Sequence, residues 1–297
     1  MTSQVMAGGV GLRHDEGMMN ATAHTEAPRS AGDALRRLRK DRRVSQLDLS
    51  LRVGVSQRHL SCIETGRAKA SREMLHALLD ALEAPLADRN DTLLAAGFAP
   101  AFRRRALGDA EMAPVRRALA QLLDAHDPAP AFVLDDAWNL VQANRGTAAM
   151  MAMLGVDPAA LAGGLNLLQA MLAPGGLAAA LINADEVLAE VWQRAQREAM
   201  LSPALRTLVE ALRPQLPRRL AIAPPSAVSA PVLQTRLRTI DGGELNFFSA
   251  FTTFGAPLDV TAASLRVEHF FPADDGTRRR MAEAVTRAAP RPAAPRG

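Results

Sequence analysis

Between residues 33 and 97, apolar positions recur at helical spacing in short runs that Ser, Gly and Pro interrupt. Residues 34–43 combine leucines with cations at the period of an amphipathic helix. Ser71 stands where it can begin a further helix with a broad apolar stripe, and Pro85 separates that helix from the next one. Together with two helices within residues 44–66, the pattern predicts an all-α domain of five short helices.

Residues 44–66 predict two of these helices, joined by a glycine-centred turn. Ser45 and Ser56 each stand where a hydroxyl can accept from the free N–H groups at a helix start. Asp48 follows Ser45 at capping-box spacing. Gly54 tolerates the left-handed conformation with which many helices end. The stretch therefore predicts a helix-turn-helix.

The two helices of this motif differ in the faces that they present. Leu47 and Leu51 share one face of the first helix, while Leu60 and Ile63 point inward from the second. The outer face of the second helix is polar and rich in hydrogen-bonding groups. Such a face suits the major groove of DNA, where the base edges offer a distinct pattern of donors and acceptors. It is formed by Gln57, Arg58 and Ser61.

After residue 112 the pattern changes to a mixture of strands and helices. Two short strands come first, helical segments follow, and a hairpin around Asp241-Gly242-Gly243 precedes a last strand. This order predicts an α+β domain with a five-stranded antiparallel sheet and helices packed on one face. The predicted strands are residues 131–135, 138–144, 232–240, 244–255 and 264–271. The predicted helical segments after them are residues 144–154, 166–172, 184–200 and 203–212.

Length and charge divide the chain in the same way. The 297 residues suggest about two domains. Residues 33–105 contain 15 Lys and Arg against 9 Asp and Glu, whereas the whole chain has a formal charge of only +4. A basic module joined to a slightly acidic remainder fits a nucleic-acid reader with a second domain. We expect a disordered tail at 1–31, a helix-turn-helix domain at 32–98, a linker at 99–111, a PAS-like domain at 112–273 and a flexible tail at 274–297.

The linker carries the cluster Arg103-Arg104-Arg105. These arginines either add phosphate contacts or keep a short connector soluble.

Residues 45–75, SQLDLSLRVGVSQRHLSCIETGRAKASREML, resemble the λ-repressor-like helix-turn-helix of the XRE family of bacterial regulators. The resemblance implies that the second helix reads bases, that residues after it follow the phosphate backbone, and that Arg39 pairs with Glu64. Cys62 stands where many relatives carry a polar reader. The candidate DNA-binding residues are Arg39, Gln46, Ser56, Gln57, Arg58, Ser61, Cys62, Thr65, Arg67, Lys69 and Arg72.

Residues 112–273 resemble the MmyB-like ligand-binding domain, above all in AWNLVQANRGT and FGAPLDVTAASLRVEHFFPADD. The resemblance implies a PAS-like fold and a small, apolar ligand such as a fatty acid, held between sheet and helices. Pockets of this kind combine an apolar lining with a few polar groups. Each aromatic or Met side chain considered could equally be ordinary core. The candidate ligand-binding residues are Trp138, Asn144, Met151, Phe248, Phe251 and His269.

Signals of catalysis are absent from the sequence. The six histidines show no metalloprotease spacing, and one cysteine allows neither an intramolecular disulfide nor a thiolate metal site. We therefore expect no enzyme activity, no cofactor and no metal. No run of about 18 apolar residues is present, so we expect no membrane association. The single cysteine suits a reducing cytoplasm, which is the location we expect.

The sequence thus predicts a transcriptional regulator that binds a double-stranded DNA operator and senses a ligand. A homodimer is expected, because two half-sites one helical turn apart need two recognition helices. The alternative is a protein-interaction adaptor, in which the helix-turn-helix binds a partner protein and the second domain dimerises. Dependence of binding on salt distinguishes the two, because phosphate contacts release counterions.

Overall fold

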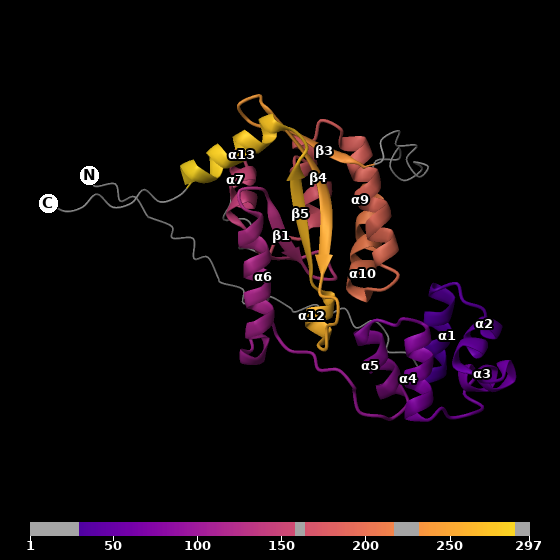
Figure 1. Cartoon of the computed structure of the whole chain (residues 1–297). Helices are drawn as coiled ribbons and strands as arrows, with labels where there is room; N and C mark the ends of the chain where they lie inside the picture. Colours follow the sequence, from indigo (N-terminus) through magenta and orange to yellow (C-terminus); the bar gives the residue numbers. More distant parts are fainter. Residues whose placement is uncertain (1–29, 158–163, 217–231, 289–297) are drawn as a thin grey trace, which may run out of the picture.

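The computed structural model of the protein describes residues 30–157, 164–216 and 232–288 (Figure 1). The disordered tail predicted for residues 1–31 lies outside this part of the chain, except for its last two residues. Ser30 caps the first helix and accepts from the Asp33 N–H at 3.1 Å. Five helices form the N-terminal domain, as predicted. They are α1 (Ala31–Asp41), α2 (Gln46–Val53), α3 (Gln57–Glu64), α4 (Arg72–Ala81) and α5 (Leu86–Ala95).

Local sequence signals explain where these helices begin and end. Ser45, Ser56 and Ser71 each accept a hydrogen bond from the backbone N–H three residues on, at 3.0–3.1 Å. Gly54 ends α2 with a φ of 74°. The helices then bury one shared core, which consists of Leu35, Leu38, Leu49, Leu60, Ile63, Leu75, Leu78, Leu79, Leu82, Ala84 and Leu93.

The inward face of α2 is formed by Leu49 and Ser50, both of which are buried. Leu47 and Leu51 share a face, as predicted, but that face points to solvent, and they are 50% and 70% exposed. A helix of only eight residues presents about two turns, so residues two positions from Leu49 lie away from the core.

Asp88 on α5 is an acidic side chain whose burial makes its ionisation unfavourable. Its side chain is 14% exposed and lies 3.7 Å from the Arg37 guanidinium. Burial raises the pKa of Asp88 from its ordinary value of 3.8 to about 6, although the positive charge of Arg37 acts in the opposite direction. The folded protein therefore holds the proton more tightly than the unfolded chain, and stability is lost as pH rises from about 4 to 6.

Asp88→Asn is accordingly expected to stabilise the N-terminal domain at pH 7.5 by about 1–3 kcal/mol, since the amide needs no ionisation. At pH 4, where the folded wild type already carries the proton, the two proteins should unfold at nearly the same urea concentration. Urea unfolding at the two pH values measures this. A gain of equal size at both would contradict the role given to the buried charge.

The C-terminal domain is an α+β structure whose secondary-structure order agrees with the prediction. Helix α6 precedes two strands, three longer helices and several short ones follow, and three more strands and a final helix end the domain (Figure 1). The strands are β1 (Ala131–Leu134), β2 (Leu140–Ala143), β3 (Gln234–Arg238), β4 (Glu244–Thr253) and β5 (Arg266–Pro272). The helices are α6 (Ala113–His126), α7 (Arg145–Met153), α8 (Leu167–Leu172), α9 (Ala184–Glu198), α10 (Pro203–Leu212), α12 (Val260–Ser264) and α13 (Asp275–Ala288), with 3₁₀ turns at Ala110–Met112, Leu177–Ala180 and Arg213–Gln215.

All five strands join one antiparallel sheet in the order β2-β1-β5-β4-β3. The last strand in the chain thus lies at the centre, between β1 and β4. Its register sets His269 opposite Ala131 on one side and Ala250 on the other. The predicted five-stranded antiparallel sheet is confirmed.

Helices cover both faces of this sheet, so the expectation that they lie on one face is wrong in part. The larger core contains Leu245 and Phe247 from β4 and packs under α7, α9 and α10. On the opposite face, α6 packs Leu119 and Leu123 against β1 and β5. Strand β1 is buried at all four positions because both of its faces are covered.

The C-terminal segment from Asp275 is a helix, which corrects the prediction of a flexible tail over 274–297. Helix α13 packs on α7 and buries Met281, Ala284 and Val285 at helical spacing. Asp274 accepts from the Thr277 N–H at 2.7 Å and fixes its first turn. This segment is therefore part of the domain core. Residues 289–297 lie outside the described residues.

The linker at residues 99–111 is attached to both domains. On one side, the Asn90 side chain of α5 bonds the backbone of Ala101 and Phe102. On the other, the Arg105 guanidinium donates to Asp259 at 3.0 Å, and the Val260 N–H donates to the Arg103 carbonyl at 2.9 Å. Asp259 caps α12, which lies beside α5 (Figure 1). Arg105 thus has a structural partner, while Arg103 and Arg104 are exposed.

No helix of the described residues is long and apolar enough to cross a membrane. Within residues 30–157, 164–216 and 232–288, no group of three His, Cys, Asp or Glu side chains could hold a metal ion.

Candidate nucleic-acid interface and ligand cavity

Helix α3 presents its polar face to solvent. Gln57 and Arg58 on its first turn are exposed, and Ser61 and Cys62 one turn later are half-buried. The Ser56 hydroxyl is occupied as the cap of this helix and accepts from the His59 N–H at 3.1 Å. The exposed first turn is therefore free to meet an external partner, as a helix that reads a groove with its N-terminal residues requires.

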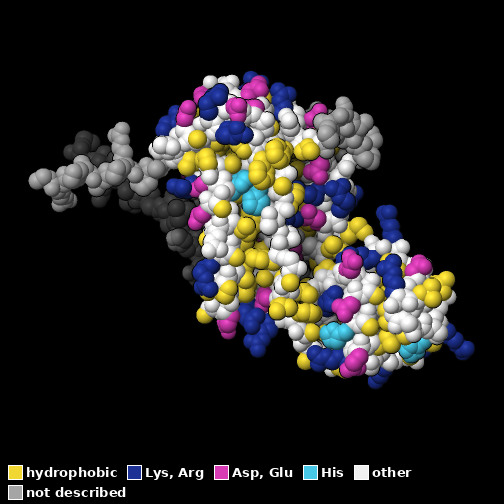
Figure 2. Space-filling model, viewed as in Figure 1, with side chains coloured by type: hydrophobic (Ala, Val, Ile, Leu, Met, Phe, Trp, Pro, Cys, Tyr) yellow, Lys and Arg dark blue, Asp and Glu magenta, His cyan; other side chains and the backbone are white. Residues whose placement is uncertain are grey.

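A row of polar and cationic residues continues from the C-terminal end of α3 to the start of α4. Thr65, Arg67, Lys69 and Arg72 are all exposed. In Figure 2, Lys and Arg side chains project from the N-terminal domain into solvent. A group of cations beside a polar helix face is the arrangement expected of a DNA-binding surface, where the cations contact phosphates and the helix contacts bases.

Arg39 and Gln46 stand behind this surface and support it. Arg39, which is 8% exposed, donates to the two carboxylate oxygens of Glu64 at 2.6 and 2.8 Å and to the Val44 carbonyl at 3.0 Å. The Gln46 amide donates to the same carboxylate at 2.8 Å. The predicted pairing of Arg39 with Glu64 is confirmed. Arg39 and Gln46 were both predicted to contact DNA, but these side chains donate to Glu64 instead. Glu64 thereby joins α1, α2 and α3.

The ionisation of this cluster follows from its contacts. Burial acts to raise the pKa of Glu64, but the hydrogen bonds from Arg39 and Gln46 and the charge of Arg39 outweigh it, so the pKa lies below the ordinary value. The hydrogen bond with Glu64 raises the pKa of Arg39 above its ordinary value in turn. Glu64 therefore remains a carboxylate that holds the three helices together.

The C-terminal domain encloses a cavity of about 290 Å³ between one face of the sheet and the helices above it. Such a volume is near the lower end of the range for small-molecule sites. Of the predicted ligand residues, Met151 and Phe251 line it. Its apolar wall also includes Phe132, Met150, Leu154, Leu167, Met171, Leu177, Leu181, Val187, Val191, Leu237 and Phe270.

Phe248 and His269 do not line the cavity, which corrects their assignment. Phe247 faces the larger core, Ser249 and Phe251 face the cavity, and strand alternation turns Phe248 to the other side. There Phe248 stacks on Phe271 with ring centroids 5.2 Å apart. His269 points to the same opposite face and meets His126 edge to face at 4.8 Å.

Trp138 and Asn144 are also outside the cavity lining. Trp138 is fully buried in a turn with a positive φ of 67°, and its indole N–H donates to Glu198 at 2.7 Å. Asn144 caps α7 by accepting from the Thr147 N–H and also bonds the backbone around Ala131. The hydrogen bonds of both side chains stabilise the domain. Trp138 and Asn144 are therefore structural residues of the core and do not line the cavity.

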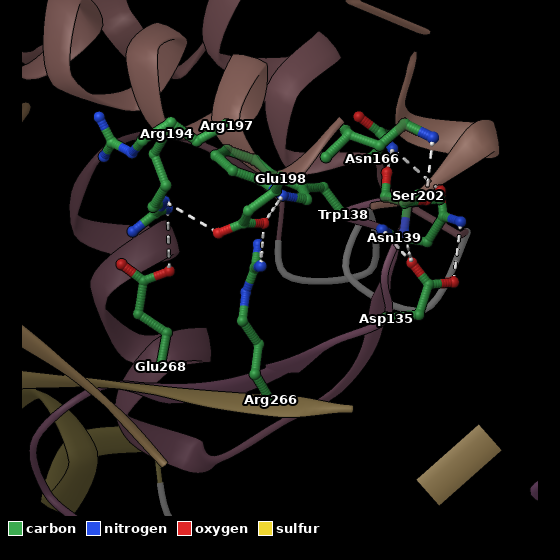
Figure 3. Close-up of polar contacts among 12 residues, drawn as sticks. Asp135, Trp138, Asn139, Asn166, Arg194, Arg197, Glu198, Ser202, Arg266 and Glu268 are labelled. Atoms are coloured by element: carbon green, nitrogen blue, oxygen red, sulfur yellow. Dashed lines mark hydrogen bonds and ion pairs between the residues drawn. The ribbon is translucent and has the colours of Figure 1, made fainter. Parts of the chain in front are cut away.

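One end of the cavity is polar, and none of its residues is among the predicted ligand-binding residues. Glu190 and Arg194 of α9 and Glu268 of β5 line this end. Arg194 Nη2 lies 3.7 Å from Glu268 Oε2 (Figure 3). The guanidinium also stands over the rings of Trp138 and Phe251, at 4.6 and 4.5 Å from their centroids. Burial raises the pKa of Glu268, with the charge of Arg194 acting against it. We call this group of charged residues the polar end.

Glu198, one turn after Arg194 on α9, connects the polar end to neighbouring side chains. It accepts from Trp138 and from Arg266, and lies 3.9 Å from Arg194 (Figure 3). Arg194 is thereby set between two carboxylates and two aromatic rings. An ion pair at helical spacing on α9 is visible in the sequence, but its meeting with Glu268 on β5 depends on tertiary packing.

Comparison with protein families identifies both domains. Residues 30–91 match a helix-turn-helix domain model, and residues 115–284 match the model of the MmyB-like transcription regulator ligand binding domain. The second match alone covers more than half of the chain. This chain belongs to the MmyB-like transcription regulators. It is a DNA-binding transcription regulator with a ligand-binding domain, and both domains are of a type that is generally non-enzymatic.

The MmyB-like regulator has no significant match among curated proteins. A solved structure titled "Structure of an RNA-binding Light-Oxygen-Voltage Receptor" aligns with 86% of this chain at 13% identity and a TM-score of 0.24. The chain spans 62% of that protein's length.

Proposed function

We propose that this regulator is a homodimer that reads an operator with α3 and changes its DNA binding when a small, largely apolar, fatty-acid-like ligand occupies the cavity of the C-terminal domain. The observation that carries this proposal is the cavity itself, an apolar chamber with one polar end in a chain that also presents an exposed recognition helix. Homodimerisation is proposed because a two-fold operator needs two copies of α3.

The linker supports a physical route between the two domains. The cavity is lined by Phe251 of β4 and Glu268 of β5, and these strands are joined by the segment that contains Asp259 and α12. Asp259 holds Arg105 of the linker, which continues directly from α5. A ligand that favours one position of β4 and β5 would therefore favour one position of the DNA-binding domains, by as much as its affinities for the two states differ.

Substitutions of two arginines, Arg58 and Arg67, can distinguish contacts with bases from contacts with phosphates. Arg58→Ala is expected to cost about 1–3 kcal/mol of binding and to relax preference at one base position, because Arg58 is on the exposed first turn of α3. Arg67→Ala is expected to weaken binding to all sequences alike and to lower the salt slope by about 1. Binding to operators selected from random DNA, at several salt concentrations, measures both effects.

Arg279→Ala provides the matched control, since Arg279 is an exposed arginine on α13, far along the chain from the helix-turn-helix. It should leave affinity and sequence preference unchanged. If Arg58→Ala and Arg67→Ala both lowered affinity without altering preference, Arg58 would not be a base reader.

The adaptor alternative is favoured by one observation, the exposure of Leu47 and Leu51 on α2. An apolar patch of this kind suits a protein partner. Binding through it would change little with salt, whereas binding through about six phosphates would fall by orders of magnitude between 50 and 200 mM salt. The salt series on the wild type therefore distinguishes the two functions.

A further inference from the structure

The polar end of the cavity contains a hydrogen-bond acceptor and a donor that the fold leaves unsatisfied. Glu268 is 4% exposed, and its Oε2 has no hydrogen-bond partner among the described residues. The same holds for Nε of Arg194. The 3.7 Å between Arg194 Nη2 and Glu268 Oε2 is too long for a direct hydrogen bond. An oxygen or nitrogen atom set to one side of the line that joins them, however, can lie about 2.8 Å from both.

Leaving such groups unpaired in a buried site is unfavourable, and most buried polar atoms in native proteins have partners. Arg194 cannot easily turn away, because its guanidinium is held over the rings of Trp138 and Phe251. Glu268 is fixed on the central strand of the sheet. The pair is therefore a preorganised site for a ligand head group that enters from the apolar cavity.

The charges around the cavity restrict the kind of head group. In the described part of the chain, two carboxylates, Glu190 and Glu268, and one cation, Arg194, line the cavity. Each carboxylate around the polar end already has an arginine partner. Glu268 lies 3.7 Å from Arg194 and Glu190 lies 3.5 Å from Arg197, while Glu198 accepts from Arg266. A ligand carboxylate would therefore add an uncompensated negative charge in a site where water screens little. A ligand ammonium would add an uncompensated positive charge in the same way.

We propose that the cavity selects an amphiphile whose head group is neutral and both accepts and donates a hydrogen bond, such as a long-chain alcohol or primary amide. The head-group oxygen accepts from Arg194, and its O–H or N–H donates to Glu268, while the alkyl chain lies among the Met, Leu and Phe side chains. This inference rests on the proposed function, because it assumes that the cavity is the ligand site, and it replaces the carboxylate of a fatty acid by a neutral head.

The test is a head-group series at constant chain length. Dodecanol, dodecanamide, dodecanoate and dodecylamine are titrated into the full chain at pH 8, below their critical micelle concentrations, by calorimetry or by displacement of a fluorescent probe. The alcohol and the amide should bind at least about tenfold more tightly than the carboxylate and the amine, since a hydrogen bond to a charged group is the difference. This comparison needs no variant, so it cannot fail through misfolding.

Glu268→Gln assigns the preference to one residue. The amide has nearly the same shape but can donate to an anionic head, so the preference for alcohol over carboxylate should fall about tenfold. Glu283→Gln is the control, because Glu283 is exposed on α13, and it should keep the wild-type order.

Four results would overturn the proposal. Tightest binding of dodecanoate by the wild type, or an undiminished preference for alcohol over carboxylate in Glu268→Gln, would show that the polar end does not select a neutral head. Equal binding of all four compounds would also show that the polar end does not select the head group, but the apolar cavity would remain the ligand site. Binding of none would remove the proposed ligand site and the head-group preference together.

Discussion

Glu64→Ala is expected to lower the free energy of unfolding of the N-terminal domain by about 3–5 kcal/mol. The reason is that the Glu64 side chain is fully buried and holds Arg39, whose side chain is 10% exposed. Removing one partner of a buried pair leaves the other charge without compensation. Loss on this scale is a large fraction of the stability of a small domain, so DNA binding should fail at moderate temperature as well.

The chain offers a way to observe the two domains separately. It contains no Tyr and two Trp, and both Trp138 and Trp192 belong to the C-terminal domain. Urea unfolding followed by Trp fluorescence therefore reports that domain, while far-UV circular dichroism reports the helices of both. Glu64→Ala should shift the early part of the dichroism transition and leave the fluorescence transition in place.

Two comparisons keep this result interpretable. Asp91→Ala, at an exposed carboxylate on α5, should change stability by less than about 0.5 kcal/mol. Replacing both partners, Arg39→Met with Glu64→Leu, should recover most of the loss, since a well-packed apolar pair can be as stable as a buried ion pair. If Glu64→Ala behaved like Asp91→Ala, the cluster would contribute little to the fold.

Acid should act on the wild type in the same direction. Because the folded-state pKa of Glu64 lies below its unfolded value of about 4.5, its carboxylate contributes stability above that pH. This contribution is lost as the pH falls through the folded-state value. The difference in stability between wild type and Glu64→Ala should therefore shrink in acid.

Features governed by local sequence could be predicted well. Ser45 and Ser56 cap helices and Gly54 ends one, because each of these roles needs only the next few residues. The hairpin at Asp241 and the order of strands were predictable for the same reason. The pairing of Arg39 with Glu64, which are 25 residues apart, was accessible only through family resemblance.

The ligand cavity was predicted poorly because its lining depends on which face of each strand is covered. Strand alternation requires that Phe248 and Phe251 lie on opposite faces, so the prediction that both line one cavity contradicted itself. Alternation alone does not tell which of the two faces the helices. Glu268 was overlooked because a lone carboxylate in a strand gives no signal until Arg194, 74 positions earlier in the chain, is brought beside it.

The contact that the linker makes with the C-terminal domain could not be predicted from the sequence. Of the two interpretations of Arg103-Arg104-Arg105, neither included an ion pair with Asp259, which is 154 residues away. Asp259 is buried, and it also caps α12 by accepting from the Thr261 N–H at 2.9 Å. Arg105 is thus the side chain by which the linker is attached to the segment between β4 and β5.

Arg105→Ala is therefore expected to abolish most of the effect of ligand on DNA binding, while leaving each site intact. Coupling between two sites typically amounts to about 1–3 kcal/mol, a change of roughly 5- to 150-fold in affinity, and the variant should retain only a small part of it. The measurement is DNA affinity with and without a saturating amphiphile, for wild type and variant. Ligand affinity of the variant, measured without DNA, should equal that of the wild type.

Arg104→Ala is the matched control, because Arg104 is the neighbouring linker arginine and its side chain is exposed. If the linker arginines served mainly to contact phosphates, both variants would lower DNA affinity and the salt slope equally, with or without ligand. If instead the ion pair transmits the state of the cavity, Arg104→Ala keeps the ligand response and Arg105→Ala loses it. The two substitutions remove the same charge from adjacent positions, so a difference between them points to the contact with Asp259. Equal ligand responses in both would contradict this route between the domains.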